Sequence, residues 1–305
     1  RYRLRRSIRE WIAAGDTYQV NYTFGMDAPC TRDPEAWFTF LCKAQQADYC
    51  AYIDTGDHCI LSASPELFFR LDGERVVTRP MKGTRPRGLS RETDRQVAHE
   101  LATSPKERAE NVMIVDLLRN DLGRIAEADS VCVESLFDVE RYPTVWQMTS
   151  TVSARTRANV PDIFRALFPC GSVTGAPKVR TMQIIRDIEP YPRGIYCGAI
   201  GWWGPGRCAE FSVPIRTVTM DRATGTAHYA VGSGVTWDSD PGAEFAECCA
   251  KAAILDYDVP EFQLIESLRY MTGYWLLDEH LTRLCDSAEY FGFAYDRPGV
   301  ERALG

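Results

Sequence analysis

The chain has 305 residues, of which 45% are hydrophobic and 25% are charged, so it is expected to be globular rather than disordered. Its net charge of -7 and its isoelectric point near 5.3 argue against a nucleic acid or an anionic membrane as partner. No stretch approaches 18 consecutive apolar residues, so the sequence predicts no membrane span.

Eleven cysteines are scattered along the chain, and their spacing matches neither a zinc site nor a dense disulfide scaffold. We therefore expect free thiols in a cytoplasmic protein. The basic N-terminus has a helical pattern with Glu10 and no apolar core, so it is not a signal peptide. Because the chain lacks a starting methionine and stops within a pattern, we expect it to be part of a longer protein.

The first third of the chain mixes helical and strand patterns. Residues 5–14 have helical spacing, and the stretch from Thr17 alternates as a strand does. A second helix is predicted over 36–47, and strands with a hairpin turn at "LDGER" fill 49–81.

The stretch "RPMKGTRPRG", residues 79–88, places one lysine among three arginines, two prolines and two glycines. Prolines and glycines exclude a regular helix, so we predict a turn-rich loop. Two interpretations of Lys82 remain open from these residues alone: a solvated basic loop, or an amine that performs chemistry.

Two helical segments are predicted between Glu92 and Ala126. Ser104, Pro105 and Glu107 form a capping-box signature at the break between them. Beyond residue 129, strand runs at 194–204, 210–221 and 226–237 have short connections, which imply antiparallel pairing. Strands and helices that mix without regular alternation favour an α+β fold with large, mostly antiparallel sheets and flanking helices.

Two predicted helix starts carry paired acids, Glu107 with Glu110 and Glu244 with Glu247. Residues three apart share a helix face, and four converging carboxylates could hold a Mg²⁺ ion. Each pair also has an ordinary explanation, since Glu107 fits the capping box and Glu247 could pair with Lys251 on a solvated face.

Glycines and one arginine add further candidate binding features. The stretch "FPCGSVTGAPK", residues 168–178, could bind an anion at a helix start or be an ordinary glycine turn. Gly232 and Gly234 lie inside a predicted strand, where they indicate a close backbone approach or a bulge. Arg216 could face solvent or clamp a carboxylate. Together these features favour a small substrate that carries several carboxylates, with a metal ion.

The stretches "AGDTYQVNYT", "SASPELF", "PMKGTRPRG", "DLLRNDLGRIA", "GSVTGAPK" and "VGSGVTWDSDPGAEF" occur in family order over about residues 5–257 and resemble the chorismate-utilising enzymes. That family contains anthranilate, aminodeoxychorismate, isochorismate and salicylate synthases. The resemblance implies that Glu110 and Glu247 bind Mg²⁺, with Glu107 and Glu244 supporting the waters of the metal. It also implies a set of residues that bind the other chorismate carboxylate: Thr174, Gly175, Tyr196, Arg216, Gly232 and Gly234.

Two positions are expected to select the reaction. Family members that add water have a lysine base where this chain has Gln19, so water addition is disfavoured. Anthranilate synthases have alanine at the position of Lys82, whereas aminodeoxychorismate synthases have lysine. The resemblance therefore implies that Lys82 attacks ring carbon 2 and that ammonia then adds at carbon 4, with anthranilate synthesis as the alternative. A nucleophilic lysine must be neutral, so we expect burial or Arg79 and Arg85 to lower its pKa.

One family residue is missing from the sequence. The family histidine that assists departure of the hydroxyl is replaced in "TVWQMTSTV" by Trp146 and Gln147, which leaves the general acid unassigned. No amidotransferase cysteine motif occurs, so ammonia is expected to come from a glutamine amidotransferase that is either a separate chain or a segment missing from this one. The implied product leads to 4-aminobenzoate and folate.

A linker that contains Asp256, Asp258 and Pro260 divides the chain into a synthase domain, residues 1–258, and a second piece, residues 259–305. In the second piece we predict a strand, a turn at "MTG" and a helix from about Asp278. It resembles the start of an aminodeoxychorismate lyase-like enzyme that uses pyridoxal phosphate (PLP). Arg283 matches an arginine that contacts the PLP phosphate, but the lysine that binds PLP would lie beyond residue 305, so no lyase activity is expected.

Overall fold

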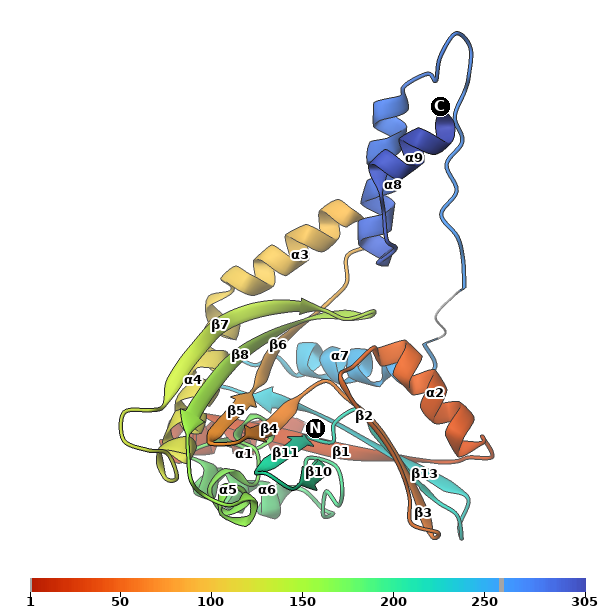
Figure 1. The fold of residues 1–305 in the computed structure, drawn as a ribbon. Coiled ribbons are helices and arrows are strands. Elements are labelled where there is room, and N and C mark those ends of the chain that lie inside the picture. Colours follow the sequence, from red (N-terminus) through yellow and green to blue (C-terminus); the bar gives the residue numbers. More distant parts are fainter. Residues whose placement is uncertain (1, 258–260) are drawn as a thin grey trace.

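The structure is a computed structural model that describes residues 2–257 and 261–305 (Figure 1). Two antiparallel sheets form its body, which confirms the predicted fold class. The first sheet has the strand order β2-β3-β12-β13-β1-β9. Its strands are β1 (Gln19–Pro29), β2 (Tyr49–Asp54), β3 (His58–Ser64), β9 (Gly175–Ala176), β12 (Thr217–Asp221) and β13 (Thr226–Val235).

The second sheet has the strand order β10-β11-β4-β5-β8-β6, and β7 pairs with β8 as well. Strand β8 is long enough for β5 to pair with one part of it and β6 with another. The strands are β4 (Leu67–Asp72), β5 (Arg75–Arg79), β6 (Met81–Pro86), β7 (Cys132–Arg141), β8 (Val145–Arg155), β10 (Ile200–Gly204) and β11 (Cys208–Ser212).

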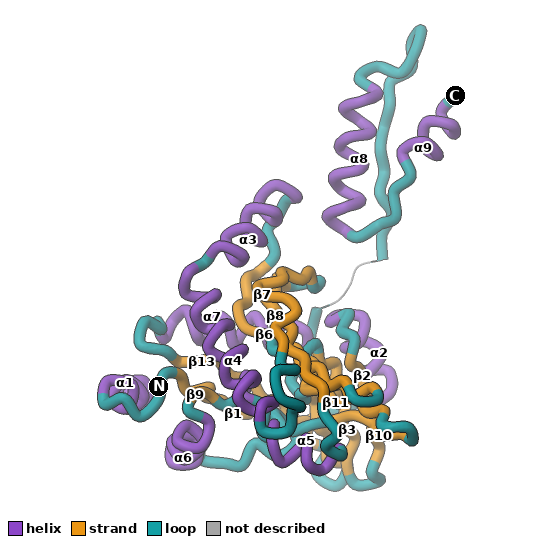
Figure 2. The backbone as a smooth tube through the Cα atoms, turned by 60° about the vertical axis from the view of Figure 1, so that its left-hand side comes forward, coloured by secondary structure: helices purple, strands orange, loops and turns teal. Residues whose placement is uncertain are grey.

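Helices cover the sheets and connect them (Figure 2). They are α1 (Tyr2–Ala13), α2 (Pro34–Gln45), α3 (Arg91–Thr103), α4 (Pro105–Gly123), α5 (Val160–Leu167), α6 (Lys178–Ile188), α7 (Pro241–Ala252), α8 (Leu277–Phe291) and α9 (Arg297–Leu304). Short 3-10 turns occupy Gly171–Val173 and Ala253–Leu255. No helix within the described residues is both long and apolar enough to cross a membrane.

Separate apolar cores hold the helices on the sheets. One core joins the second sheet to α4 and α5 through buried side chains that include Phe68, Val115 and Ile163. Another joins the first sheet to α2 and α7, with Leu41 and Val218 among its members. Alternate residues of β1 pack against helices, with Val20 in a core formed with α1 and α6 and Phe24 against the core of α2 and α7.

The predicted break between two helices is confirmed at Ser104, whose hydroxyl accepts a hydrogen bond from the Glu107 backbone N–H at 3.4 Å. The predicted stretch 210–221 is not one strand. It divides into β11 in the second sheet and β12 in the first, with the chain passing between sheets at Val213–Arg216. An alternating pattern predicts the strands but not the sheet that each one joins.

The prediction of a loop at residues 79–88 was wrong, because Met81–Pro86 form strand β6. This strand pairs only with β8 and lies at the edge of the sheet, where prolines are tolerated. Its register shifts between Met81 and Thr84, and Gly83 has a φ of 94°. The shift is a bulge, a device that redirects side chains, and Lys82 sits on it.

The C-terminal segment projects away from the two sheets in both views and returns to the body at the end of α8, beside α3 (Figures 1 and 2). The helix predicted from about Asp278 is confirmed as α8, which begins at Leu277. The strand predicted before it is not formed, since residues 261–276 contain only an isolated bridge between Tyr270 and Tyr274. The predicted linker and boundary, at Asp258 and Pro260, lie outside the described residues.

Candidate active site

A cavity of about 810 Å³, counted to its open mouth, lies between the two sheets. Strands β1 and β13 line it on one side, β6 and β8 on the other, and α4 and α7 contribute charged side chains. Its ionisable lining residues are Glu66, Lys82, Lys106, Glu107, Glu110, Tyr196, Arg216, Glu244, Glu247 and Lys251.

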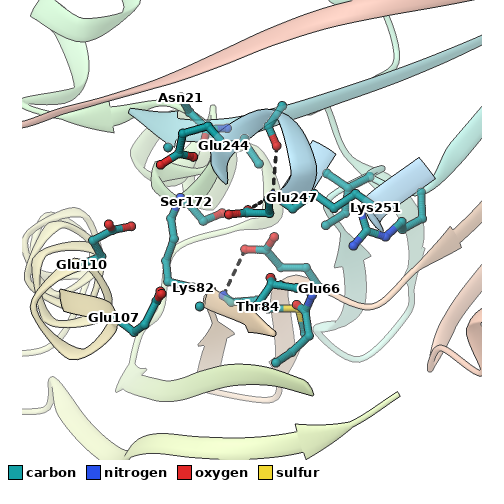
Figure 3. Close-up of a pocket in the computed structure, with 18 of the residues that line it drawn as sticks. Asn21, Glu66, Lys82, Thr84, Glu107, Glu110, Ser172, Glu244, Glu247 and Lys251 are labelled. Atoms are coloured by element: carbon teal, nitrogen blue, oxygen red, sulfur yellow. Dashed lines mark hydrogen bonds and ion pairs between the residues drawn. The ribbon is translucent and has the colours of Figure 1, made fainter. Parts of the chain in front are cut away.

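The first predicted acid pair lies on the first turns of α4 and points into the cavity (Figure 3). The Glu110 carboxylate accepts a hydrogen bond from Gln19 Nε2 at 3.2 Å, and burial raises its pKa to about 7. Glu107 lies 3.3 Å from Arg85, and burial also raises its pKa. Ser104 caps the helix, but the Glu107 carboxylate faces Arg85, so the reciprocal half of the predicted capping box is replaced by an ion pair.

The second acid pair comes from α7, and both of its carboxylates reach the same cavity (Figure 3). Burial opposes ionisation of Glu247, but Lys251 at 2.5 Å outweighs it and the pKa of Glu247 is lowered. The i,i+4 pairing expected between them is therefore present, although it lies in the cavity rather than on a solvated face. The Lys106 ammonium lies 3.9 Å from a carboxylate oxygen of both Glu110 and Glu244.

The two acid pairs supply the kind of ligand atoms, carboxylate oxygens, that a hard divalent cation binds. All four groups are carboxylates, which Mg²⁺ prefers, and one cation, the half-exposed Lys106 ammonium, already lies between acids of two helices. Burial is the main cause of the raised pKa values of Glu107 and Glu110, and a bound cation would oppose it. Within residues 2–257 and 261–305, however, no three His, Cys, Asp or Glu side chains are close enough together to form a metal site. Binding would require these carboxylates to exchange their lysine and arginine partners for the ion.

Lys82 extends from the β6 bulge into this cavity. Burial is the main cause that lowers the pKa of its amine, and Lys251 adds to the effect, whereas Glu110, Glu66 and Glu247 oppose it. The expected direction of the shift is thus confirmed. The expected contribution of arginines was wrong, because Arg79 pairs with Glu140 and Arg85 pairs with Glu107.

Glu66 is a cavity residue that the sequence analysis did not single out. It is only 2% exposed, and its carboxylate accepts a hydrogen bond from the Met81 N–H at 3.4 Å (Figure 3). Burial raises its pKa, although Ser172 and Lys82 act in the opposite direction. A glutamate inside the apolar run "SPELFF" was the available signal, because an acid is rarely buried without a purpose.

Arg216 supplies an anion-binding group to the cavity. Its side chain is buried, its backbone has a φ of 53°, and its Nε has no hydrogen-bond partner within the described residues. A buried guanidinium N–H is costly to leave unpaired, so it fits a carboxylate of a bound ligand. Tyr196 also lines the cavity, and burial raises the pKa of its hydroxyl well above the usual range, so it stays a neutral hydrogen-bond donor.

The glycine-rich stretch reaches the cavity through Ser172 and Val173, whereas Thr174 and Gly175 lie outside its lining. The Thr174 carbonyl accepts a hydrogen bond from the Asn21 N–H at 2.8 Å. Gly175 has a φ of 146°, and a Cβ there would come within 2.1 Å of the Gln19 carbonyl oxygen. These two residues therefore join the stretch to β1.

An ion pair holds the end of the same stretch. Lys178 Nζ lies 2.5 Å from Asp121 Oδ2 at the end of α4, and it donates a hydrogen bond of 2.8 Å to the Leu167 carbonyl at the end of α5. The two charged side chains are 12% and 6% exposed. One lysine thus ties together the ends of α4 and α5 and the start of α6.

Gly232 and Gly234 both line the cavity, and each also permits close strand packing. A Cβ at Gly234 would lie 2.1 Å from Gln19 Nε2, and a Cβ at Gly232 would lie 2.6 Å from the Tyr22 carbonyl oxygen. Gln19 itself is fully buried behind Glu110 and does not line the cavity.

The two residues that replace the family histidine point in different directions. Gln147 lines the cavity and donates a hydrogen bond of 3.1 Å to the Thr84 hydroxyl. The Trp146 indole N–H donates to Asp94 at 2.8 Å, outside the cavity. Neither residue is an acid, so a proton would have to come from another cavity group, and Glu66, Glu107 and Glu110 are cavity carboxyls whose pKa burial raises.

Arg283 lies on α8, far along the chain from this cavity. Its guanidinium is mostly exposed and pairs with Glu266, whose pKa the arginine lowers to about 2. His280 Nδ1 lies 2.6 Å from the same carboxylate. Because this arginine already has an anionic partner, residues 261–305 alone do not fit the phosphate of PLP.

Comparison with known proteins gives consistent matches. A family model described as chorismate binding enzyme matches residues 4–256. The aminodeoxychorismate synthase of Streptomyces griseus is 47% identical over 247 residues, which are 80% of this chain and 34% of the relative. Aminodeoxychorismate synthase component 1 of Salmonella typhimurium is 43% identical over 79% of this chain and 53% of its own length.

The fold matches a solved structure as well. Anthranilate synthase component I of Streptococcus pneumoniae superposes with a TM-score of 0.75 at 32% identity, over 83% of this chain and 56% of that one. The chain therefore spans between about a third and about half of the length of these relatives.

Proposed function

This chain belongs to the chorismate binding enzymes, and from that premise we propose that it carries the site at which chorismate is aminated at carbon 4. The product would be 4-amino-4-deoxychorismate. The observation that carries the proposal is the position of Lys82, whose amine projects into a cavity that also holds five glutamates and an arginine. Relatives named aminodeoxychorismate synthase, 47% and 43% identical, support the same choice.

Chorismate bears two carboxylates, and the cavity offers a separate group of residues for each. Arg216 would clamp one carboxylate through its unpaired Nε, and the neutral Tyr196 hydroxyl would donate to it. Glu110 and Glu247 would hold Mg²⁺, with Glu107 and Glu244 supporting its waters. Bound there, the ion would supply positive charge to the other carboxylate.

Lys82 would act as the nucleophile. Its neutral amine forms a bond to ring carbon 2 while the bond between carbon 4 and its hydroxyl breaks, and the lowered pKa of Lys82 favours that neutral form. The nitrogen, now bonded to carbon 2, gives up one proton. Ammonia then bonds to carbon 4 as the bond from carbon 2 to Lys82 breaks, and the proton that the new amine loses passes to the departing lysine.

Glu66 would supply the proton with which the hydroxyl leaves as water. Its raised pKa favours the protonated form, and it faces the same cavity as Lys82. The proton released by the lysine nitrogen restores the acid. Gln19 would not activate water, because an amide is no base at neutral pH, and its N–H is engaged by Glu110.

Anthranilate synthesis, with amination at carbon 2 and loss of pyruvate, is the second candidate. The similarity to anthranilate synthase component I of Streptococcus pneumoniae favours it. Lys82 is the feature that argues against it, since the family resemblance places alanine there in anthranilate synthases.

The source of ammonia would be a separate glutamine amidotransferase, as the name component 1 of the Salmonella relative implies a second component. The reaction would then lead to 4-aminobenzoate and folate. All eleven cysteines are free thiols in the structure, which fits a cytoplasmic location. Residues 261–305 would belong to a lyase-like domain, whose Arg283 pairs with Glu266 in the structure.

Mass spectrometry of the product made from chorismate, Mg²⁺ and ammonium tests the proposal. We expect 4-amino-4-deoxychorismate from the wild-type chain, and a chorismate adduct on Lys82 when ammonium is omitted. The Lys82→Ala variant should form no adduct, and Lys43→Ala, on α2 and outside the cavity lining, is the matched control. Anthranilate with pyruvate as the product, or undiminished synthase activity in Lys82→Ala, would contradict the assignment.

A further inference from the structure

The last turns of α8 contact the body of the protein through complementary charges. Arg91 on α3 lies 2.5 Å from Asp286 and 2.7 Å from Glu289, and Arg95 lies 2.6 Å from Glu289. Exposed pairs of this kind contribute little individually, and salt screens them. They nevertheless orient the end of α8 toward a second set of contacts that is better shielded from solvent.

Arg87 is the centre of that second set. Its guanidinium stacks between two aromatic rings, 5.2 Å from the ring centroids of both Trp146 and Tyr290. It also makes two hydrogen bonds to Asp94, at 2.7 and 2.6 Å, and the Arg87 and Asp94 side chains are only 12% and 7% exposed. Such a bidentate and stacked arginine is fixed in orientation.

Tyr290 completes the contact from α8. Its hydroxyl donates a hydrogen bond of 2.7 Å to the Gly88 carbonyl, and its own carbonyl accepts one of 3.4 Å from Arg87 Nη2. Gly88 lies so close to α3 that a Cβ there would meet the Asp94 N atom at 2.3 Å. Tyr290 therefore packs onto a tightly packed cluster formed by Arg87, Gly88 and Asp94.

This cluster is continuous with the strand that carries Lys82. Arg87 follows directly after β6, and its N–H donates to the Thr144 carbonyl at 3.2 Å, next to the start of β8. Strand β6 is an edge strand interrupted by the Gly83 bulge, so strand pairing alone holds it weakly. Whatever fixes Arg87 therefore also fixes one end of the segment on which Lys82 sits.

We infer that the end of α8 is a latch for the Lys82 strand: docking of Tyr290, Glu289 and Asp286 onto Arg87, Arg91 and Arg95 holds β6 in its place. Through this latch the C-terminal segment contacts the chain next to β6, the strand whose Lys82 lines the cavity. The latch is independent of the reaction proposed above, since it concerns the order of β6 and not the chemistry of Lys82.

Hydrogen–deuterium exchange of the full chain, read in peptides that cover residues 79–95, tests the latch. Tyr290→Ala removes the stacking ring and the hydroxyl, and we expect it to speed exchange there by roughly fivefold, as the loss of one cation–π contact and one hydrogen bond implies. Tyr290→Phe keeps the ring and should give a smaller increase. Glu289→Lys should also speed exchange, and less so at high salt.

Tyr274→Ala is the matched control, because Tyr274 lies in the same segment and, among the described residues, its ring packs on Tyr270 and its hydroxyl donates to the Leu304 carbonyl. It should leave exchange in residues 79–95 as in the wild type. Unchanged exchange in Tyr290→Ala, or an equal increase in Tyr274→Ala, would overturn the latch.

Discussion

The buried pair of Lys178 and Asp121 allows a prediction with a calculable size. Replacement of Lys178 by methionine keeps the length of the side chain but leaves Asp121, which is 6% exposed, without its cation. It also removes the hydrogen bond to the Leu167 carbonyl. Breaking one partner of a buried pair costs about 3–5 kcal/mol, because an uncompensated charge remains.

The cost should depend on pH in a defined direction. Burial already raises the pKa of Asp121 against the opposing effect of Lys178, so loss of the lysine raises it further. A carboxyl whose folded pKa is raised costs stability as pH rises through that pKa, and costs none while it is protonated in both states. Lys178→Met should therefore be most destabilising near pH 8 and less so near pH 5.

Urea unfolding followed by tryptophan fluorescence at these two pH values measures the effect. At pH 8 we also expect the melting temperature to fall on the order of 10 °C. The double variant Lys178→Met/Asp121→Asn removes the stranded charge and should recover most of the loss. A loss below about 1 kcal/mol, or a double variant less stable than Lys178→Met, would refute the reasoning.

Three further outcomes are expected at the cavity. The rate of adduct formation should reach its plateau at a pH below 10.5, the ordinary pKa of a lysine amine, because burial lowers the pKa of Lys82, and a rate that still rises above that pH would contradict the lowered pKa. Arg216→Lys should raise the KM for chorismate by about 10- to 100-fold, the value of a charge-assisted bidentate contact, with an unchanged circular dichroism spectrum. Glu247→Gln should raise the Mg²⁺ concentration for half-maximal activity by roughly tenfold or more, whereas the exposed Glu35→Gln should leave it unchanged, and equal Mg²⁺ requirements would remove Glu247 from the site.

The parts of the fold set by local chemistry were predictable. The Ser104 cap, the helices that carry the paired acids and the antiparallel strands were all expected from neighbouring residues. The two acid pairs and Lys82 do lie around one cavity. The spacing of the acids alone could not distinguish a metal site from ordinary ion pairs. The family motifs favour the metal site, which stays a prediction, and the structure shows these acids in ion pairs with lysine and arginine.

The parts set by long-range contacts were not predictable. Residues 81–86 form a strand because β8 offers an unpaired stretch beside β5, and no local pattern reports that. Glu66 was missed because a single acid in an apolar run has no periodicity. Besides burial, the charged groups that shift the pKa of Lys82 lie on α4, on α7 and, in the case of Glu66, just before β4. The arginines adjacent to Lys82 in sequence were therefore the wrong groups to consider.

The contact between Gly234 and Gln19 limits how the specificity of this site can change during evolution. A methyl group at position 234 would overlap the Gln19 amide, so Gly234→Ala would displace Gln19 from Glu110. A lysine in place of Gln19 would occupy the same position and would also face the Glu110 carboxylate. The order of substitutions therefore matters, because a larger residue at position 234 would leave no space for a new side chain at position 19. Libraries built to alter the reaction should therefore keep Gly234 and Glu110 fixed and vary position 19.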